Sequence, residues 1–134
     1  MNSPQLIHLP KFLDNRGNLS FIEEKNHIPF KIERAYWIYD VPGGEHRGGH
    51  AYRHLDEFIV ALSGSFDVVL HDGHKEMKFS LNRSYYGLYI PRMMWRDIEN
   101  FSTNSLALIL SNGGYDELDY IRDFDEFAND VHNQ

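Results

Sequence analysis

Four polar side chains, His50, Tyr52, Glu57 and Arg96, have types and spacings that could support chemistry together. His50 and Tyr52 lie two residues apart, and alternate residues of a strand face the same way, so both should project from one face. Glu57 should arrive from the following strand. An imidazole beside a carboxylate can hold a divalent metal ion, or the imidazole can act by itself as a general base. The residues around His50 decide between these two uses.

The elements that must position these residues are short apolar stretches of alternating character, separated by turn residues. Residues 58–62 alternate larger and smaller side chains, residues 63–65 turn the chain, and a second apolar stretch follows at 66–70. Further strands are predicted at residues 16–24, 32–41, 75–81, 85–91 and 105–112. So many strands around one core predict a single all-β domain, a sandwich or a closed jelly-roll barrel.

The tail of the chain, residues 116–131, has a different pattern. Leu118, Ile121, Phe124 and Phe127 recur at helix-like spacing, which predicts a short C-terminal helix lying across the barrel. The acidic residues of this segment are expected on the exposed face of that helix.

Composition excludes several classes of function. The 134 residues include 13 Lys and Arg against 20 Asp and Glu, and the net charge of -7 argues against a nucleic-acid partner. The chain has no cysteine, so neither disulfides nor thiolate chemistry is expected, which fits a reducing compartment. No apolar run approaches the roughly 18 residues of a membrane span, and the N-terminus has no apolar signal region. We therefore expect a soluble, cytoplasmic protein that does not associate with a membrane.

Two stretches, Gly44 to Gly64 and Gly87 to Asn100, resemble the two signatures of the cupin superfamily. The resemblance implies a cupin double-stranded β-helix over residues 1–134. Of the four positions that usually bind metal in cupins, only His50 and Glu57 keep a ligand, because Tyr52 and Arg96 stand at the other two. A neutral tyrosine is a poor ligand, and a fixed cation repels a divalent ion. We therefore expect no metal and no other cofactor.

A narrower resemblance covers nearly the whole chain. The stretches "DNRGNLSFIEEKNHIPFKIERAYWIYDVPGGEHRGGHAYR", "GLYIPRMMWRDIENFS" and "YDELDYIRDFDEF" resemble the sugar 3,4-ketoisomerases, metal-free cupins that act on dTDP-4-keto-6-deoxyglucose. Members of that family make the 3-keto sugars that aminotransferases convert to 3-amino-3,6-dideoxyhexoses of surface polysaccharides. The resemblance also implies a homodimer that exchanges an N-terminal strand.

The expected reaction removes a proton next to a ketone, which requires a base within hydrogen-bond reach and stabilisation of the enolate. His50 is the predicted base, and it matches the essential histidine of the family. Tyr52 stands where several relatives have a second histidine. It is predicted to donate a hydrogen bond or relay a proton, and the alternative is that it only fills the barrel. Arg96 is expected to hold sugar oxygens or developing negative charge, or else to pair simply with Glu57 or Asp97.

The diphosphate of a nucleotide sugar requires cations, and arginine suits it best. Tyr36 and Tyr39 are predicted to share a strand face and to contact thymine or sugar hydroxyls, with ordinary aromatic packing as the alternative. The predicted substrate-binding residues are Arg16, Arg34, Tyr36, Tyr39, Arg47, Arg53, Glu57 and Arg96.

Three points stay open. Relatives that give the galacto product resemble one another in carrying Arg at the position of Arg16 and His at that of Arg96, so this chain shares one feature with each group. Tyr52 also suits a nucleotide-sugar 3,5-epimerase, which pairs a histidine base with a tyrosine acid. The loss of the second histidine suits a non-catalytic module that binds a nucleotide sugar.

Overall fold

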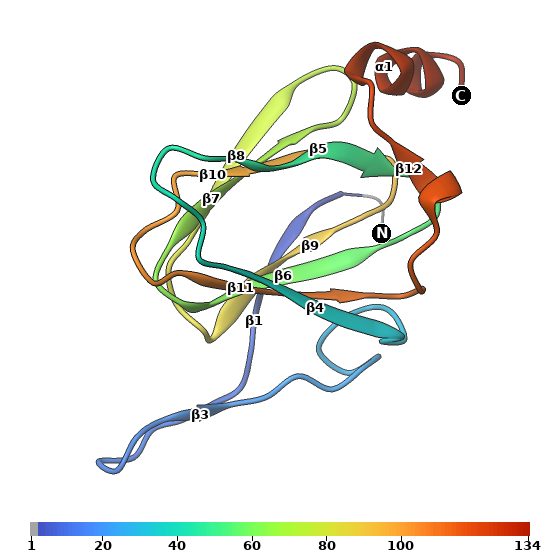
Figure 1. Ribbon diagram of the computed structural model, residues 1–134. Coiled ribbons are helices and arrows are strands. Elements are labelled where there is room, and N and C mark those ends of the chain that lie inside the picture. Colours follow the sequence, from blue (N-terminus) through green and yellow to red (C-terminus); the bar gives the residue numbers. More distant parts are fainter. Residues whose placement is uncertain (1–2) are drawn as a thin grey trace.

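The computed structural model describes residues 3–134, in which two five-stranded antiparallel sheets face each other around a common core (Figure 1). The first sheet contains, in spatial order, β1 (Gln5–His8), β9 (Tyr86–Ile90), β6 (Glu57–Ser63), β11 (Leu106–Ser111) and β4 (Arg34–Tyr39). The second contains β12 (Tyr120–Ile121), β5 (Arg47–Tyr52), β10 (Trp95–Glu99), β7 (Phe66–His71) and β8 (Glu76–Leu81). This arrangement confirms the predicted all-β double-sheet barrel.

The central strand β6 is apolar on both faces because both faces are covered. Ile59 and Ala61 point between the sheets and belong to the main core. Phe58 and Val60 point outward, where they pack with residues such as Ile28 and Phe30 from the segment before β4. A strand buried on both sides reads as a continuous apolar run instead of a strict alternation.

The chain passes from the first sheet to the second between β6 and β7, at Gly64. Gly64 has a positive φ of 68°, and a Cβ atom there would lie 2.5 Å from the Ser102 hydroxyl and 2.8 Å from the Ser105 Cα atom. Only glycine fits this corner without strain. The two apolar stretches on either side of it therefore belong to different sheets and do not pair with each other.

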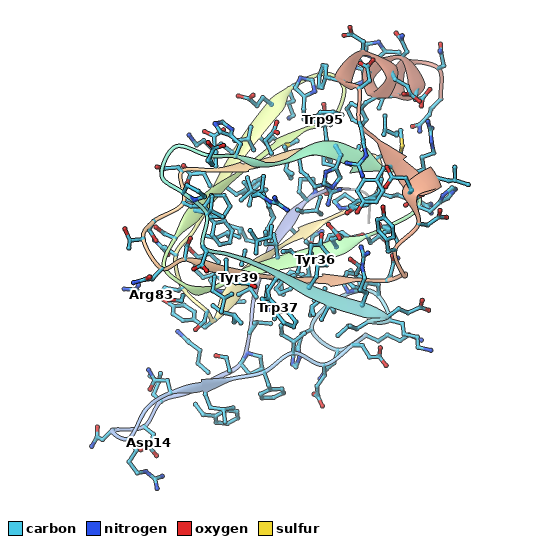
Figure 2. The ribbon with its side chains drawn as sticks, in the orientation of Figure 1. Asp14, Tyr36, Trp37, Tyr39, Arg83 and Trp95 are labelled. Atoms are coloured by element: carbon cyan, nitrogen blue, oxygen red, sulfur yellow. The ribbon has the colours of Figure 1, made fainter. Side chains whose placement is uncertain are left out.

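The N-terminal region differs from the prediction. β1 was not predicted, and it forms the edge of the first sheet by pairing with β9. Of the predicted strand at residues 16–24, only β3 (Leu19–Ser20) forms, and it pairs with β2 (Lys11–Phe12) in a short hairpin. This hairpin extends away from the barrel and carries Asp14 near its tip (Figure 2). No second layer of the same chain is available there for a longer strand to pack against.

The predicted C-terminal helix is real but shorter than expected. α1 (Phe124–His132) begins at Asp123, whose side chain accepts a hydrogen bond from the Asp125 backbone, and Phe127 is buried against the barrel. The expectation of helix before residue 123 was wrong. A 3-10 turn, η1 (Glu117–Asp119), and the strand β12 occupy that stretch, and Leu118 is 87% exposed. β12 forms because the edge of β5 offers free backbone partners.

Among the described residues, no helix has the length and apolar character that crossing a bilayer requires.

Candidate active site

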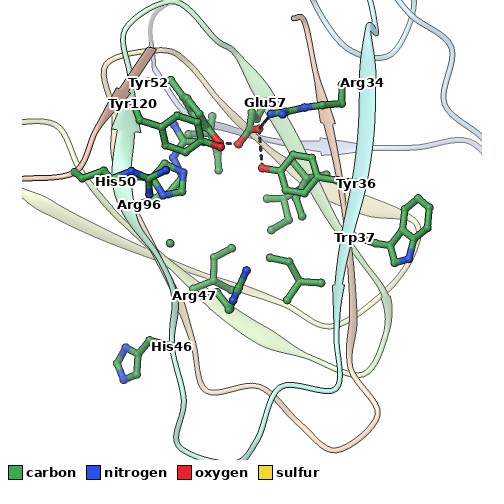
Figure 3. Close-up of a pocket in the computed structure, with 17 residues that line it drawn as sticks. Arg34, Tyr36, Trp37, His46, Arg47, His50, Tyr52, Glu57, Arg96 and Tyr120 are labelled. Carbon is green, nitrogen blue, oxygen red and sulfur yellow. Dashed lines mark hydrogen bonds and ion pairs between the residues drawn. The ribbon is translucent and has the colours of Figure 1, made fainter. Parts of the chain in front are cut away.

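A cavity of about 520 Å³ lies between the two sheets and is lined by polar side chains from five strands (Figure 3). The alternation of each strand decides which residues reach it: Arg34 and Tyr36 from β4, His50 and Tyr52 from β5, Glu57 from β6, Arg96 from β10 and Tyr120 from β12. Arg47, His46 and Arg122 complete its polar lining.

His50 is held in a form suited to accept a proton. One ring nitrogen is engaged with the backbone of Gly48, whereas Nε2 is buried and has no hydrogen-bond partner among residues 3–134. Burial, and next the guanidinium of Arg96 on the neighbouring strand, lower the pKa of His50 to about 4. The imidazole is therefore neutral at pH 7, with its Nε2 lone pair available.

A glycine on β5, Gly48, lets this strand approach β10 closely, so that His50 lies beside Arg96. Gly48 has a φ of 99°, and a Cβ atom there would lie 2.8 Å from the carbonyl oxygen of Arg96. The β5–β10 pairing shifts its register just after Arg96, which lies directly opposite His50. Directly opposed residues of an antiparallel pair point to the same face, so both side chains enter the cavity.

Glu57 anchors the opposite wall of the cavity. Its Oε1 atom accepts a hydrogen bond from Arg96 Nη1 at 2.8 Å, and its Oε2 atom accepts from the Tyr36 hydroxyl at 2.7 Å and the Ser111 hydroxyl at 2.6 Å. Arg34 Nη2 lies 4.0 Å from the same Oε2 atom. The pairing of Arg96 with Glu57, which was one of the two alternatives, is therefore present.

These contacts do not fit a divalent metal ion. Both carboxylate oxygens of Glu57 already accept hydrogen bonds, and the guanidinium of Arg96 brings a fixed positive charge to the position where a third ligand would be needed. Residues 3–134 contain no group of three or more His, Cys, Asp or Glu side chains arranged to hold such an ion.

Tyr52 and Tyr120 form a hydroxyl pair next to His50. The Tyr52 hydroxyl donates to that of Tyr120 at 3.1 Å, and the two rings meet edge to face with centroids 4.7 Å apart. Their ring centroids lie 4.8 Å and 5.0 Å from that of His50. Burial, and then the charge of Glu57, raise the pKa of Tyr52 above its ordinary value. Its phenol therefore stays protonated and can donate.

The structure brings seven of the predicted residues into the cavity: Arg34, Tyr36, Arg47, His50, Tyr52, Glu57 and Arg96. Tyr39 is not among them. The prediction that Tyr36 and Tyr39 share a strand face was wrong, because residues three apart on a strand point to opposite faces. Tyr39 is largely exposed, and Trp37 likewise points away from the cavity (Figure 3).

Two predicted arginines also lie elsewhere. Arg53 follows β5 and forms ion pairs with Asp130 at 2.7 Å and Glu126 at 3.0 Å, both on α1. Arg16 lies on the β2–β3 hairpin, outside the cavity of its own chain, and its exposed guanidinium pairs with Asp14 at 2.8 Å.

Sequence reasoning missed Tyr120 and Arg122, because a helix was predicted where β12 forms. Tyr120 lies directly opposite Tyr52 in the β5–β12 ladder, and the guanidinium of Arg122 lies 4.2 Å from the centre of its ring. Arg122 is in turn paired with Glu117. The only signal was the quoted "DYIRDFDEF" stretch, whose pattern no general requirement of a barrel explains.

The expectation that the acidic tail is simply exposed was also incomplete. Asp119 is buried and lies 2.7 Å from Nδ1 of His54, which ties the segment before β12 to the loop after β5.

The cavity is positively charged in a protein whose net charge is -7. Four guanidinium groups line it, from Arg34, Arg47, Arg96 and Arg122, against the single carboxylate of Glu57. A low-dielectric cavity with such an excess of cations favours an anionic ligand.

Comparisons with known proteins agree with this chemistry. The chain matches the family described as "FdtA: WxcM-like, C-terminal" over residues 2–132. It is 40% identical over 123 residues to the TDP-4-oxo-6-deoxy-alpha-D-glucose-3,4-oxoisomerase of Aneurinibacillus thermoaerophilus, covering 92% of this chain and 88% of the relative.

Solved structures are similar along almost the whole chain. A 3,4-ketoisomerase from Helicobacter canadensis is 38% identical, with a TM-score of 0.94 over 98% of this chain and 99% of the other. A histidine-to-asparagine variant of the 3,4-ketoisomerase QdtA from Thermoanaerobacterium thermosaccharolyticum, in complex with TDP-4-keto-6-deoxyglucose, is 32% identical. Its TM-score is 0.96 over 100% of this chain and 97% of the other.

Proposed function

The chain belongs to the FdtA family of sugar-nucleotide 3,4-ketoisomerases, and from this we propose that it converts dTDP-4-keto-6-deoxyglucose to a dTDP-3-keto-6-deoxyhexose. The observation that carries the proposal is the buried Nε2 of His50, which has a free lone pair in a cavity lined by guanidinium groups. The 3-keto product has the carbonyl that an aminotransferase needs to form a 3-amino-3,6-dideoxy sugar.

The reaction moves a carbonyl between neighbouring carbons through an enediol. Nε2 of His50 takes the proton from C3, and the electron pair of that C–H bond forms the C3=C4 double bond as the C4 carbonyl oxygen becomes an enolate. The histidinium then returns a proton to C4, while the C3 hydroxyl loses its proton to become the carbonyl and the C4 oxygen gains a proton to become the hydroxyl. Because its pKa is lowered, the protonated imidazole gives up this proton readily. The fixed charge of Arg96, buried beside His50, stabilises the negative intermediate.

We assign the substrate-binding roles by position in the cavity. Arg47 lines the cavity near His46 and is suited to the diphosphate, because it makes no ion pair with a side chain of the described chain (Figure 3). Arg34 and Tyr36 surround Glu57, where they are suited to sugar hydroxyls. Tyr39 and Arg53 have no such role in this proposal.

We also propose a homodimer in which the β2–β3 hairpin lies against a second copy. The hairpin exposes Phe12, Leu13 and Leu19, and Leu13 is 74% exposed. Exposed apolar side chains on a projecting hairpin suit a partner surface. Exchange of an N-terminal strand remains part of this proposal, with β1 at the edge of the first sheet beside β9 as the candidate strand. In such a dimer, Arg16 would reach the cavity of the other protomer.

Incubation with dTDP-4-keto-6-deoxyglucose in deuterated water tests the function. Proton NMR should show deuterium entering at C3 and C4 and disappearance of the C4 ketone. Exchange at C5 would instead indicate a 3,5-epimerase, and binding without exchange would indicate a non-catalytic module. Full activity of the His50→Asn variant would contradict the assigned base.

A further inference from the structure

We infer that Tyr120 is a catalytic residue whose hydroxyl, paired with that of Tyr52, relays a proton between the C3 and C4 oxygens of the sugar. The juxtaposition that carries the inference is the 3.1 Å hydroxyl pair beside His50 in the same cavity. The inference rests on the proposed isomerase activity.

The reaction needs a proton transfer that His50 does not supply. Removal of the C3 proton leaves an enediolate with a hydroxyl on C3 and a negative oxygen on C4. The product instead has its carbonyl at C3 and a hydroxyl at C4. A proton must therefore leave the C3 oxygen and reach the C4 oxygen, in addition to the proton that His50 carries from C3 to C4. No oxidant, reductant or further reactant is required.

The imidazole is poorly placed to make both transfers. One ring nitrogen is engaged with the Gly48 backbone, so a single nitrogen, Nε2, faces the cavity and is occupied by the carbon-bound proton. An oxygen-to-oxygen transfer at the same moment needs a second group that can accept and donate together. A hydroxyl does this without changing its charge.

The tyrosine pair matches the spacing of the two sugar oxygens. The oxygens of a planar enediol are about one hydrogen-bond length apart, as are the hydroxyls of Tyr52 and Tyr120. One phenol accepts the proton of the C3 hydroxyl and passes its own proton to the other phenol. The second phenol gives its own proton to the C4 oxygen. Both phenols end as they began, and three O–H bonds are broken while three are formed.

The state of the pair also suits a relay. The two hydroxyls are hydrogen-bonded to each other at 3.1 Å, and both residues line the cavity. The raised pKa of Tyr52 keeps it protonated, as a relay through neutral phenols requires.

Several contacts hold Tyr120 in place. The guanidinium of Arg122 lies 4.2 Å from the centre of its ring, and Arg122 is fixed by two hydrogen bonds of 2.8 Å and 3.0 Å to Glu117. The pairing of His54 with Asp119 fixes the preceding residue. Tyr120 is thus positioned by the C-terminal segment, whose strand β12 pairs with β5.

Deuterium exchange separates the relay from the base. In deuterated water, the Tyr120→Phe variant should make product about a hundredfold more slowly, the usual scale for loss of one proton-transfer group. Deuterium should still enter C3 of the recovered substrate, because His50 is intact. The ratio of C3 exchange to conversion should therefore rise at least tenfold above that of the wild type.

A second variant tests whether the two phenols act together, and a control variant removes a tyrosine hydroxyl outside the cavity. Tyr52→Phe should raise the same ratio, and the double variant should be no slower than the slower single variant, because the two phenols act as one unit. Tyr86→Phe removes a hydroxyl that bonds Asn82 outside the cavity, and it should leave conversion unchanged.

Two results would overturn the relay. One is wild-type conversion by a folded Tyr120→Phe variant, and the other is an unchanged ratio of exchange to conversion. Wild-type protein that makes no 3-keto product would instead overturn the isomerase proposal and the relay with it, so the two failures are distinguishable.

Discussion

Nη1 of Arg96 lies 2.8 Å from Oε1 of Glu57, and the two side chains are only 3% and 2% exposed. The pair joins β10 of one sheet to β6 of the other across the cavity. A guanidinium thus supplies, as part of the chain, the positive charge that a bound metal ion would otherwise bring. The charge of Arg96 also lowers the pKa of His50. The pair therefore joins the two sheets, and its cation helps to keep the catalytic base neutral.

Removing one partner of this pair should destabilise the protein. Glu57→Gln leaves the Arg96 guanidinium buried without a compensating charge, and we expect the free energy of unfolding to fall by about 3 kcal/mol. Urea titration followed by circular dichroism measures this. Glu126→Gln, which breaks an exposed ion pair with Arg53 while Asp130 keeps that arginine paired, is the matched control and should change the midpoint little. An equal effect of the two substitutions would show that the buried pair contributes little.

The residues that line the cavity were the part of the structure best predicted from the sequence. Strand alternation correctly placed His50 and Tyr52 on one face and brought Glu57 toward them, because neighbouring strands in a narrow barrel share an interior. The same rule excludes Tyr39, which was assigned to the face of Tyr36 although it lies three residues away. Only residues an even number of positions apart on a strand share a face, so this assignment was wrong.

Other features could not be read from the sequence for physical reasons. β12 is two residues long and forms only because β5 has a free edge, which no local pattern reveals. Tyr120 and Arg122 were therefore hidden inside an apparent helix. Arg53 resembled an anion ligand by its place in the motif, yet its ion pairs with α1 depend on tertiary packing.

On the acid side, kcat/KM should begin to fall at a much lower pH than it would if the base were a histidine of ordinary pKa. The pKa of His50 is lowered to about 4, so the base stays deprotonated as the pH falls from 7.5 to 5, and kcat/KM should stay flat. A base with the reference pKa of about 6.5 would lose roughly thirtyfold by pH 5. Stopped assays of product formation measure the profile, and proton NMR of the imidazole gives the pKa directly.

Burial is the larger cause of the lowered pKa of His50, and variants of Arg96 test the contribution of its charge. Arg96→Met removes the cation, which favours the protonated imidazole, so the pKa of His50 should rise and the acid limb of kcat/KM should move to higher pH. Arg96→Lys keeps the charge and should hold the limb close to its wild-type position. A limb near pH 6.5 in the wild type would show that His50 is not the titrating base or is not shielded as the structure indicates.

Arg47 and Arg53 should behave differently although both were predicted to bind substrate. Arg47 lines the cavity, and loss of one charge-assisted contact to a diphosphate should raise the Kd for dTDP about tenfold in Arg47→Ala. Arg53 is engaged with Asp130 and Glu126, so Arg53→Ala should leave the Kd unchanged and affect only thermal stability. Isothermal titration calorimetry compares them. A Kd that rises equally in both variants would contradict the assignment of Arg47 to the site and of Arg53 to the fold.

Mixed dimers test whether Arg16 acts on the partner's cavity. Arg16 lies outside its own cavity. If it completes the cavity of the other protomer, the Arg16→Ala and His50→Asn homodimers should both lose their activity. A heterodimer of the two retains one complete site, which combines the intact His50 of one protomer with the intact Arg16 of the other. Co-expression in equal amounts should therefore restore about a quarter of the wild-type activity per site. A mixture of His50→Asn and Arg96→Met is the control, because both changes lie in the cavity of their own protomer. No complete site can form, and the activity should not exceed the residual activity of Arg96→Met alone. If the Arg16→Ala mixture gains no more activity than this control, although native mass spectrometry shows heterodimers, then the hairpin does not complete the neighbouring site.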